Sequence, residues 1–227
     1  MEQVKGPIIT LVFSDALPGA DPETVERNRK WMMEVYTPMS MKLPGLLGLD
    51  YYRIIHESLE YPLFGSVLHY KNLKDRETYM TAPESQAISK DAITWDTRGV
   101  LDPVWGEVYE LVKSFRDGSN VSEKPSTLIE NAPTMSFEAF RIDPKDEDRY
   151  VKWFEEIGTS LIPLFFKLSG FKGYDWYKDT GLHGNRDLRE DDYPKFLSVI
   201  YFTDFLRQKR AQELSLKIGY EYYPAGA

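Results

Sequence analysis

The chain has 227 residues, of which 42% are hydrophobic and 28% charged, an ordinary balance for a globular protein that buries a sizeable core. Its net charge is −8 without a Lys/Arg-rich segment to offset it, so neither nucleic acid nor an anionic membrane is an expected partner. The absence of Cys excludes disulfides and Cys-ligated metals. Residues 1–6 show no apolar signal segment, and no run approaches the ~20 apolar residues of a membrane span, so a cytoplasmic location is expected.

An apolar segment at 8–14 is enriched in β-branched and aromatic residues, which predicts a strand. The next helix is predicted to begin at Asp21, a good N-cap, with Pro22 in the first helical position. Apolar residues recur at helical spacing over 25–39. The Pro-Gly pair at 44–45 is expected to end this helix, because Gly tolerates the left-handed cap conformation.

Two strands are expected next, near 48–55 and 63–71, and a second helix from about Asp75. Segment 103–115 is ambiguous, because its apolar spacing suits a helix while the order of the preceding elements requires a fourth strand. We favour a strand from Gly106 onward.

The second half of the chain repeats this order. Segment 116–133 is rich in Ser, Pro and Asn and is interpreted as a linker, while the Gly-, Asp- and Arg-rich segment 179–193 lengthens a hairpin. The predicted elements are a strand over 135–142, a helix from Asp146 that ends at Ser169-Gly170, strands over 173–178 and 195–203, a helix from Asp204 and a last strand at 220–223.

Two sequence blocks recur in the two halves. Residues 43–53 read LPGLLGLDYYR and residues 168–178 read LSGFKGYDWYK, with Leu, two Gly, Asp and Tyr in the same places. Residues 62–73 read PLFGSVLHYKNL and residues 194–205 read PKFLSVIYFTDF, with Pro, Phe, Ser and Val in the same places. A Lys-Trp pair also lies upstream of the first block in each half. Three matches in the same order predict an internal duplication.

We therefore predict an α+β fold in which two ferredoxin-like repeats with antiparallel sheets form one α/β barrel, with the helices outside. The first repeat spans 1–115, the linker 116–133 and the second repeat 134–227. Each module leaves one apolar sheet face uncovered after its helices have packed on the other, and two copies in one chain are expected to cover these faces.

Residues 31–45 read WMMEVYTPMSMKLPG and resemble the first-helix signature of EthD-like members of the dimeric α/β-barrel superfamily, W-x-x-x-x-H-x-P followed by P-G. Residues 79–86, YMTAPESQ, are similar to the Y-x-x-x-P-E-H element of the second helix. The resemblance implies a fold shared with cofactor-free monooxygenases, polyketide cyclases, lyases and tandem-repeat haem proteins, in many of which the ligand lies between the sheet and the helices of one module. Tyr36 stands where the signature has His, and a Tyr with an ordinary pKa near ~10 is a poor base at neutral pH.

His69 is the main candidate for a general base, because His is the commonest proton-transfer group near neutral pH. In a pocket it would lie beside Tyr36 and Tyr52, whose hydroxyls would hold a carbonyl or phenolate. The alternative is a hydrogen-bonded strand histidine without a catalytic role. Asp50 and its repeat counterpart Asp175 suggest a structural task, because a catalytic residue is seldom needed in both halves.

Four more residues are candidates for ligand binding, and their alternative role is core packing or, for the histidine, a place in a surface loop. They are Trp31, His183, Tyr177 and Tyr201, the last being the repeat counterpart of His69. His56 is expected in an exposed hairpin. No carboxylate stands at a metal-ligand spacing from any of the three His, so no metal site is predicted.

These residues favour a cofactor-independent enzyme that acts on a small aromatic or polyketide-like molecule by proton transfer, of isomerase, cyclase, lyase or monooxygenase type. One alternative is a haem-binding protein of chlorite-dismutase-like type, in which His183, the only His of the second half, would be the axial ligand. Another is a non-catalytic small-ligand binding protein. Nucleotide, serine-hydrolase and zincin motifs do not occur. The expected partner is a small apolar or aromatic ligand, and a homodimer is left open.

Overall fold

The computed structural model describes residues 7–53, 64–94, 101–116, 119–120, 134–183 and 194–204. The chain divides into two compact units, Met1–Leu111 with Asp179–Tyr193, and Val112–Lys178 with Pro194–Ala227. The elements in chain order are β1 (Ile8–Ala16), α1 (Pro22–Trp31), the π-helix η1 (Met32–Tyr36), α2 (Thr37–Ser40), β2 (Leu46–Arg53), β3 (Phe64–Tyr70), α3 (Leu73–Thr81), α4 (Pro83–Thr94), β4 (Leu101–Arg116), β5 (Ser119–Asn120), β6 (Thr134–Phe140), the 3₁₀-helix η2 (Pro144–Asp146), α5 (Glu147–Trp153), the π-helix η3 (Phe154–Gly158), α6 (Thr159–Phe165), β7 (Phe171–His183) and β8 (Phe196–Phe202).

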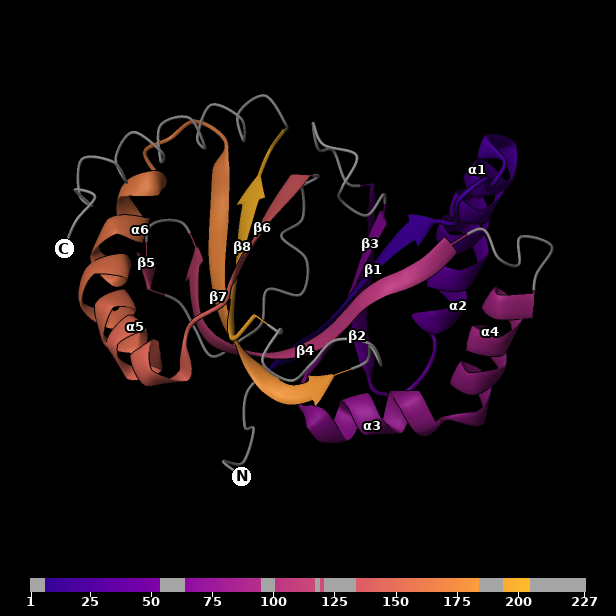
Figure 1. Cartoon of the computed structure of the whole chain (residues 1–227), viewed down its shortest axis with the longest axis horizontal. Helices are drawn as coiled ribbons and strands as arrows, with labels where there is room; N and C mark the ends of the chain where they lie inside the picture. Colours follow the sequence, from indigo (N-terminus) through magenta and orange to yellow (C-terminus); the bar gives the residue numbers. More distant parts are fainter. Residues whose placement is uncertain are drawn as a thin grey trace. The chain divides into compact units, whose positions relative to one another are not determined.

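The first unit has the ferredoxin-like order of elements, with strands arranged β2-β3-β1-β4 and every neighbouring pair antiparallel (Figure 1). Segment 103–115 lies inside β4, so the strand that we favoured there is confirmed and begins earlier than Gly106. Each unit contains part of β4 and part of β7, and the repeat boundaries at 115 and 134 stay a prediction.

The start of α1 follows the sequence closely. Asp21 is the N-cap, and its Oδ2 accepts a hydrogen bond from the backbone N–H of Thr24 at 3.0 Å, with Pro22 in the first turn. Directly after Trp31, the helix continues as the five-residue π-helix η1. This interruption was not predicted, because π turns are rare and apolar periodicity alone does not mark them.

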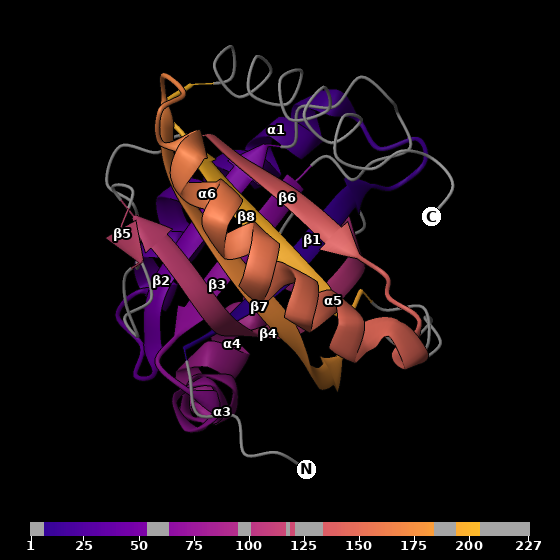
Figure 2. The same cartoon turned by 90° about the vertical axis from the view of Figure 1, so that its left-hand side faces the viewer.

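The second unit repeats the arrangement, with strand order β4-β7-β8-β6. Helices α5 and α6 cross over one face of β6, β7 and β8 (Figure 2). Asp146 is the N-cap residue of α5, as we expected, but it forms no side-chain cap hydrogen bond. A side-chain cap occurs three residues earlier, at Asp143, whose Oδ1 accepts from the N–H of Lys145 at 3.1 Å, and Pro144 opens the short helix η2. The sequence pair Asp143-Pro144 is thus the true counterpart of the Asp-Pro start in the first half.

Two irregularities occur in both halves and confirm the duplication. The pairing between the second and third strands shifts by one residue at the same place, between Leu46 and Gly48 in β2 and between Phe171 and Gly173 in β7. The π-helix η3 begins directly after Trp153, as η1 does after the matching Trp. Bulges and π turns are specific local features, so their recurrence shows two ferredoxin-like repeats. The helix from Asp204 and the strand at 220–223 lie outside the described residues.

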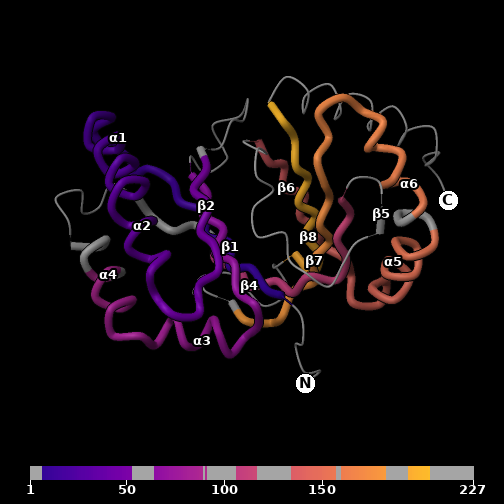
Figure 3. Tube along the Cα trace, turned by 180° about the vertical axis from the view of Figure 1, so that it is seen from behind, coloured from indigo at the N-terminus to yellow at the C-terminus, as the bar shows by residue number. Residues whose placement is uncertain are grey.

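Each unit has its own apolar core between its sheet and its helices. Figure 3 shows α1 to α4 on one side of the strands of the first unit. The first core includes Leu68 and Tyr70 of β3. Gly45 closes this core at the turn before β2. Its φ is +89°, and a Cβ there would lie 2.1 Å from the carbonyl oxygen of Asp75 in α3, so only glycine fits. The Pro-Gly signature therefore has a packing reason.

No helix within the described ranges is both long enough and apolar enough to cross a membrane.

Candidate functional site

The two faces of the first sheet separate the candidate residues. Side chains alternate along a strand, so Leu68 and Tyr70 point into the core under the helices while His69, between them, points to the opposite face. We call this opposite side of each unit's sheet the helix-free face, because the helices of the described residues pack on the other side. It also carries Asp50, because Asp50 pairs with Val67 and His69 pairs with Gly48 in the ladder between β2 and β3.

Asp50 and His69 form a close polar pair on the helix-free face. Nε2 of His69 lies 2.7 Å from Oδ2 of Asp50, and the two side chains are 5% and 14% exposed, respectively. The imidazole lies over Gly48, where a Cβ would come within 3.3 Å of its Cδ2. The glycine in the Gly-x-Asp sequence of β2 thus leaves room for the ring that the aspartate holds.

Tyr52 is on the same face, two residues beyond Asp50, and burial raises its pKa well above the usual range, with a smaller contribution from the Asp50 charge. Tyr36 is not beside His69, as we expected. It ends η1 and packs against the core on the helix side, where its ring lies 5.8 Å from that of Trp31. Our prediction that Tyr36 and His69 line one pocket is thus wrong, because the sheet of the first unit separates them.

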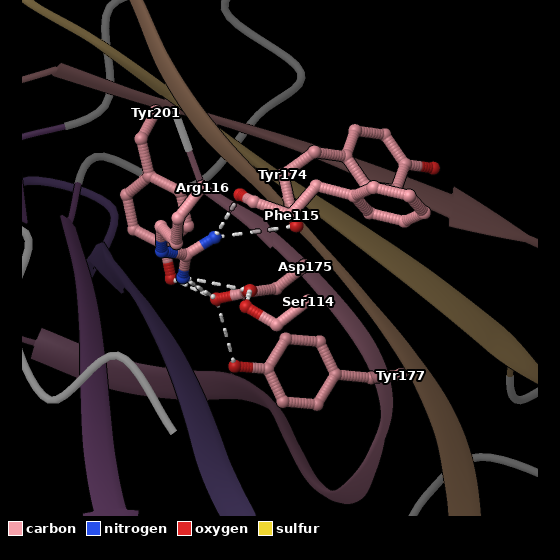
Figure 4. Close-up of polar contacts among 7 residues, drawn as sticks. All are labelled: Ser114, Phe115, Arg116, Tyr174, Asp175, Tyr177 and Tyr201. Atoms are coloured by element: carbon pink, nitrogen blue, oxygen red, sulfur yellow. Dashed lines mark hydrogen bonds and ion pairs between the residues drawn. The ribbon is translucent and has the colours of Figure 1, made fainter. Parts of the chain in front are cut away.

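The second unit uses the matching aspartate differently (Figure 4). Asp175 is fully buried and accepts hydrogen bonds from Tyr201 at 2.8 Å and from Ser114 at 2.6 Å. Nη2 of Arg116 lies 2.7 Å from each carboxylate oxygen, and the guanidinium lies 5.0 Å from the Tyr201 ring centre. A longer bond, 3.4 Å, comes from Tyr177.

This network saturates the carboxylate. Arg116 also donates to the backbone carbonyls of Phe115 at 2.7 Å and Tyr174 at 3.3 Å, which ties the end of β4 to β7. Burial, and then the charge of Asp175, raises the pKa of both Tyr177 and Tyr201 well above the usual range. Both phenols are therefore neutral donors, and the cluster is suited to holding strands together. The structural task expected from the repeated aspartate fits Asp175.

The other candidates are dispersed. Trp31 ends α1 on the helix side of the first unit. His183 is the last residue of β7, so it lies in a strand and not in the loop we expected. His56 lies outside the described residues. Tyr177 and Tyr201 both face Asp175 in the second unit.

Sequence reasoning missed Arg116 and Ser114, and it did not pair Asp50 with His69. Arg116 stands at the boundary we drew between repeat and linker, and nothing in its neighbours in the sequence marks it as a partner of Asp175. One signal was present. His69 and Tyr201 occupy the same repeat position, as do the two aspartates, so a contact in one half predicts its counterpart in the other.

Across the part of the chain that the structure describes, no group of three or more His, Asp or Glu could hold a metal ion.

The fold is α+β and consists of two ferredoxin-like repeats in tandem, as the sequence resemblance implied. No family model and no curated protein sequence matches the chain. How the two units combine into a barrel stays a prediction.

Among solved structures, this chain is similar over its whole length to a "Putative monooxygenase" from Fusobacterium nucleatum. The match covers 100% of this chain and 90% of the other, with a TM-score of 0.58 and 11% identity. An anthrone oxidase-like protein matches over 92% of this chain and 78% of its own length, with a TM-score of 0.58 and 12% identity. An EthD family protein from Bacillus halodurans matches over 45% of this chain and 94% of its own length, with a TM-score of 0.34 and 17% identity. At these identities, the two full-length matches establish a shared fold.

Proposed function

We propose that this chain is an enzyme that removes a proton from a small, largely aromatic carbon acid, with His69 as the base and Asp50 as the residue that orients it. The observation that carries the proposal is the 2.7 Å contact between His69 Nε2 and Asp50 Oδ2. A carboxylate on one ring nitrogen holds the imidazole in one tautomer and stabilises the imidazolium that forms when the other nitrogen takes a proton. Nδ1, which has no hydrogen-bond partner among the described residues, is then the accepting atom.

Tyr52 supplies the second group. Its raised pKa keeps the phenol neutral at physiological pH, so it donates a hydrogen bond to the enolate or phenolate oxygen that forms as the proton leaves. Tyr52 and Asp50 project from the same face of β2, which supports a ligand on the helix-free face of the first unit. Tyr36, on the other face, has no part in this scheme.

The reaction type that we propose is oxidation of the carbon acid by dioxygen, which is the type that the names of the two full-length neighbours suggest. Loss of the proton leaves a carbanion, which transfers electrons to dioxygen and forms a carbon–oxygen bond. The imidazolium returns its proton to the peroxide. Loss of the second C–H proton with cleavage of the O–O bond then gives the ketone and water, so R₂CH₂ and O₂ become R₂C=O and H₂O.

Anthrone is a suitable probe, because its methylene is acidic and its oxidation product has a different absorbance spectrum. Under nitrogen in D₂O, the protein should accelerate exchange of the methylene protons, measured by NMR. In air, it should consume one dioxygen per ketone formed, measured with an oxygen electrode and by absorbance. His69→Ala should slow both reactions about 10²–10⁴-fold, and added imidazole should restore part of the rate.

Two results would contradict the proposal. If the wild-type protein leaves both rates at the buffer value, the chain does not act on this carbon acid. If His69→Ala keeps the wild-type rates, the base is another residue. Accelerated exchange without oxygen uptake would keep the proton-transfer role and remove the oxidase type.

A further inference from the structure

Four methionines of the first unit are exposed, on its helices or directly after one of them. Their exposed fractions are similar, at 48% for Met33, 43% for Met39, 39% for Met41 and 47% for Met80. The oxidation of a thioether requires access of the oxidant to the sulfur. Exposure by itself would therefore give these four side chains similar rates of oxidation.

Met33 differs from the other three in the partner of its sulfur. Nη1 of Arg29, one helical turn earlier, donates a hydrogen bond to Sδ of Met33 at 3.0 Å. In the described part of the chain, the sulfurs of Met39, Met41 and Met80 have no such donor. A thioether is only a weak acceptor, so the close contact with a cation distinguishes Met33 chemically.

A carboxylate fixes the guanidinium in this position. Glu26 accepts hydrogen bonds from Nε of Arg29 at 2.8 Å and from Nη2 at 2.6 Å. Such a bidentate pair defines the direction of the guanidinium plane, so Nη1 is held toward the sulfur of Met33. Nη1 carries two N–H groups, and the second has no acceptor among the described residues. The guanidinium thus holds a further donor beside the sulfur.

The repeat does not require this pair. Both π-helices begin directly after the tryptophan that the two halves share, so Met33 corresponds to Glu155 and Arg29 to Val151. The second unit therefore has a carboxylate and an apolar side chain where the first has a thioether and a guanidinium. The contact between Arg29 and Met33 is thus a property of the first unit and not of the shared architecture.

We propose that Met33 is a site of oxidation by hydrogen peroxide, at which the guanidinium of Arg29 assists the reaction. A lone pair of the sulfur attacks one peroxide oxygen, so that the S–O bond forms as the O–O bond breaks. The second N–H of Nη1 donates to the leaving oxygen, on which negative charge develops. That oxygen takes the proton of the transferred one, so R–S–CH₃ and H₂O₂ become R–S(O)–CH₃ and H₂O. Sulfur is oxidised by two electrons and the peroxide is reduced.

The product is expected to keep its place in the helix. A sulfoxide oxygen is a stronger acceptor than a thioether sulfur, so Arg29 retains a partner at Met33. Methionine sulfoxide reductases return such a sulfoxide to the thioether, which makes the modification reversible. The inference does not rest on the proposed function, because the oxidant is a separate reagent and Met33 is not one of the residues that we assign to proton transfer.

The test measures the rate of sulfoxide formation at individual methionines. The full chain is treated with hydrogen peroxide, and tandem mass spectrometry assigns the added oxygen to each residue. Met33 should be oxidised about three- to tenfold faster than Met80, the matched control of nearly equal exposure. In the urea-unfolded chain the two rates should be equal, because the guanidinium no longer has a fixed place beside the sulfur.

The variant Arg29→Ala separates assistance by the cation from access to the sulfur. Alanine favours the helix and removes a side chain beside Met33, so access alone predicts an equal or higher rate. The proposal predicts instead that the rate at Met33 falls to within about twofold of that at Met80. Glu26→Ala, which releases the guanidinium, should lower the preference for Met33 at least about twofold.

Two outcomes would overturn the proposal: a rate at Met33 no higher than that at Met80 in the folded wild-type chain, or a preference for Met33 that survives in Arg29→Ala. Circular dichroism checks that each variant is folded. If Arg29→Ala does not fold, Glu26→Ala decides. A reduced preference for Met33 in that variant supports the site, and an unchanged preference rejects it.

Discussion

The two repeats place an aspartate at the same point of the same strand and surround it with opposite chemistry. Asp50 faces an imidazole at 2.7 Å, while Asp175 faces a phenol, a hydroxyl and the guanidinium of Arg116. In both repeats the contact crosses from the second strand to the third at a diagonal position beside the same bulge. The local backbone is therefore common, and the side chains around the carboxylate, on the third strand and for Asp175 also on β4, decide what it does.

The difference separates a reactive arrangement from a structural one. A carboxylate saturated by donors and neutralised by a cation holds strands in place, and removing a partner leaves a buried charge. A carboxylate that holds one nitrogen of an imidazole leaves the other nitrogen for proton transfer. Duplication thus provides an internal reference, since the residues of one repeat are tolerated by the fold of the other.

The largest effect is expected from His69→Tyr, which places the residue of the second repeat beside Asp50. A phenol can donate to the carboxylate, as Tyr201 does to Asp175, so the fold should be kept. A phenol is a poor base at neutral pH, so the rate with anthrone should fall about 10²–10⁴-fold. The matched control is Tyr201→Phe, which should lower stability by about 1–3 kcal/mol and leave the rate unchanged. Equal activity in His69→Tyr and wild type would show that His69 is not the base and that the two repeats do not differ in this way.

Asp175→Asn should cost about 3–5 kcal/mol of unfolding free energy, because it leaves the guanidinium of Arg116 without its carboxylate in a buried place. Asp50→Asn should cost only about 0.5–1.5 kcal/mol, since it weakens one hydrogen bond and strands no permanent cation. Urea unfolding followed by circular dichroism measures both. A larger loss for Asp50→Asn than for Asp175→Asn would reverse the assignment of the structural repeat.

Gly45→Ala should lower stability by about 2–4 kcal/mol, because the new Cβ combines a left-handed φ of +89° with a 2.1 Å contact to the Asp75 carbonyl oxygen. Gly19→Ala is the control. Its φ is +82°, but nothing lies within 4 Å of the added Cβ, so the expected loss is only about 1 kcal/mol. Thermal unfolding compares the two, and equal losses would show that backbone conformation alone explains the Pro-Gly signature.

The smallest effect concerns pH. Because burial raises the pKa of Glu138 above its value in the unfolded chain, the folded protein binds more protons over the interval between the two values. The associated stability is fully present below the unfolded pKa, near ~4.3, and is lost as pH rises through the folded pKa. This loss of unfolding free energy should be about 1 kcal/mol or less, because the side chain is only half-buried. Glu138→Gln should remove it. The free energy of unfolding, measured by urea unfolding across this pH range, should therefore fall more steeply with rising pH for wild type than for the variant.

The Asp-Pro start of α1 depends on contacts within a few residues, so the sequence was sufficient to predict it. The Gly that ends the first helical segment was predicted from its left-handed conformation, but its close approach to Asp75 in α3 is a tertiary contact. Segment 103–115 could be resolved only through the repeat, because its apolar spacing fits two kinds of element. The side-chain cap at Asp143 was missed, because Asp146, three positions later, offers an equivalent helix start.

The sequence by itself determined the α+β class, the duplication and the correspondence of His69 with Tyr201, because these follow from periodicity and from the order of similar blocks. Only the tertiary structure decided which face His69 occupies, because each face of β3 carries both apolar and polar residues and the alternation does not show which face meets the helices. Its partner Asp50 lies 19 residues away, and a one-residue shift at the bulge sets their contact. Arg116 reaches Asp175 across 59 residues through strand pairing, which no local pattern encodes.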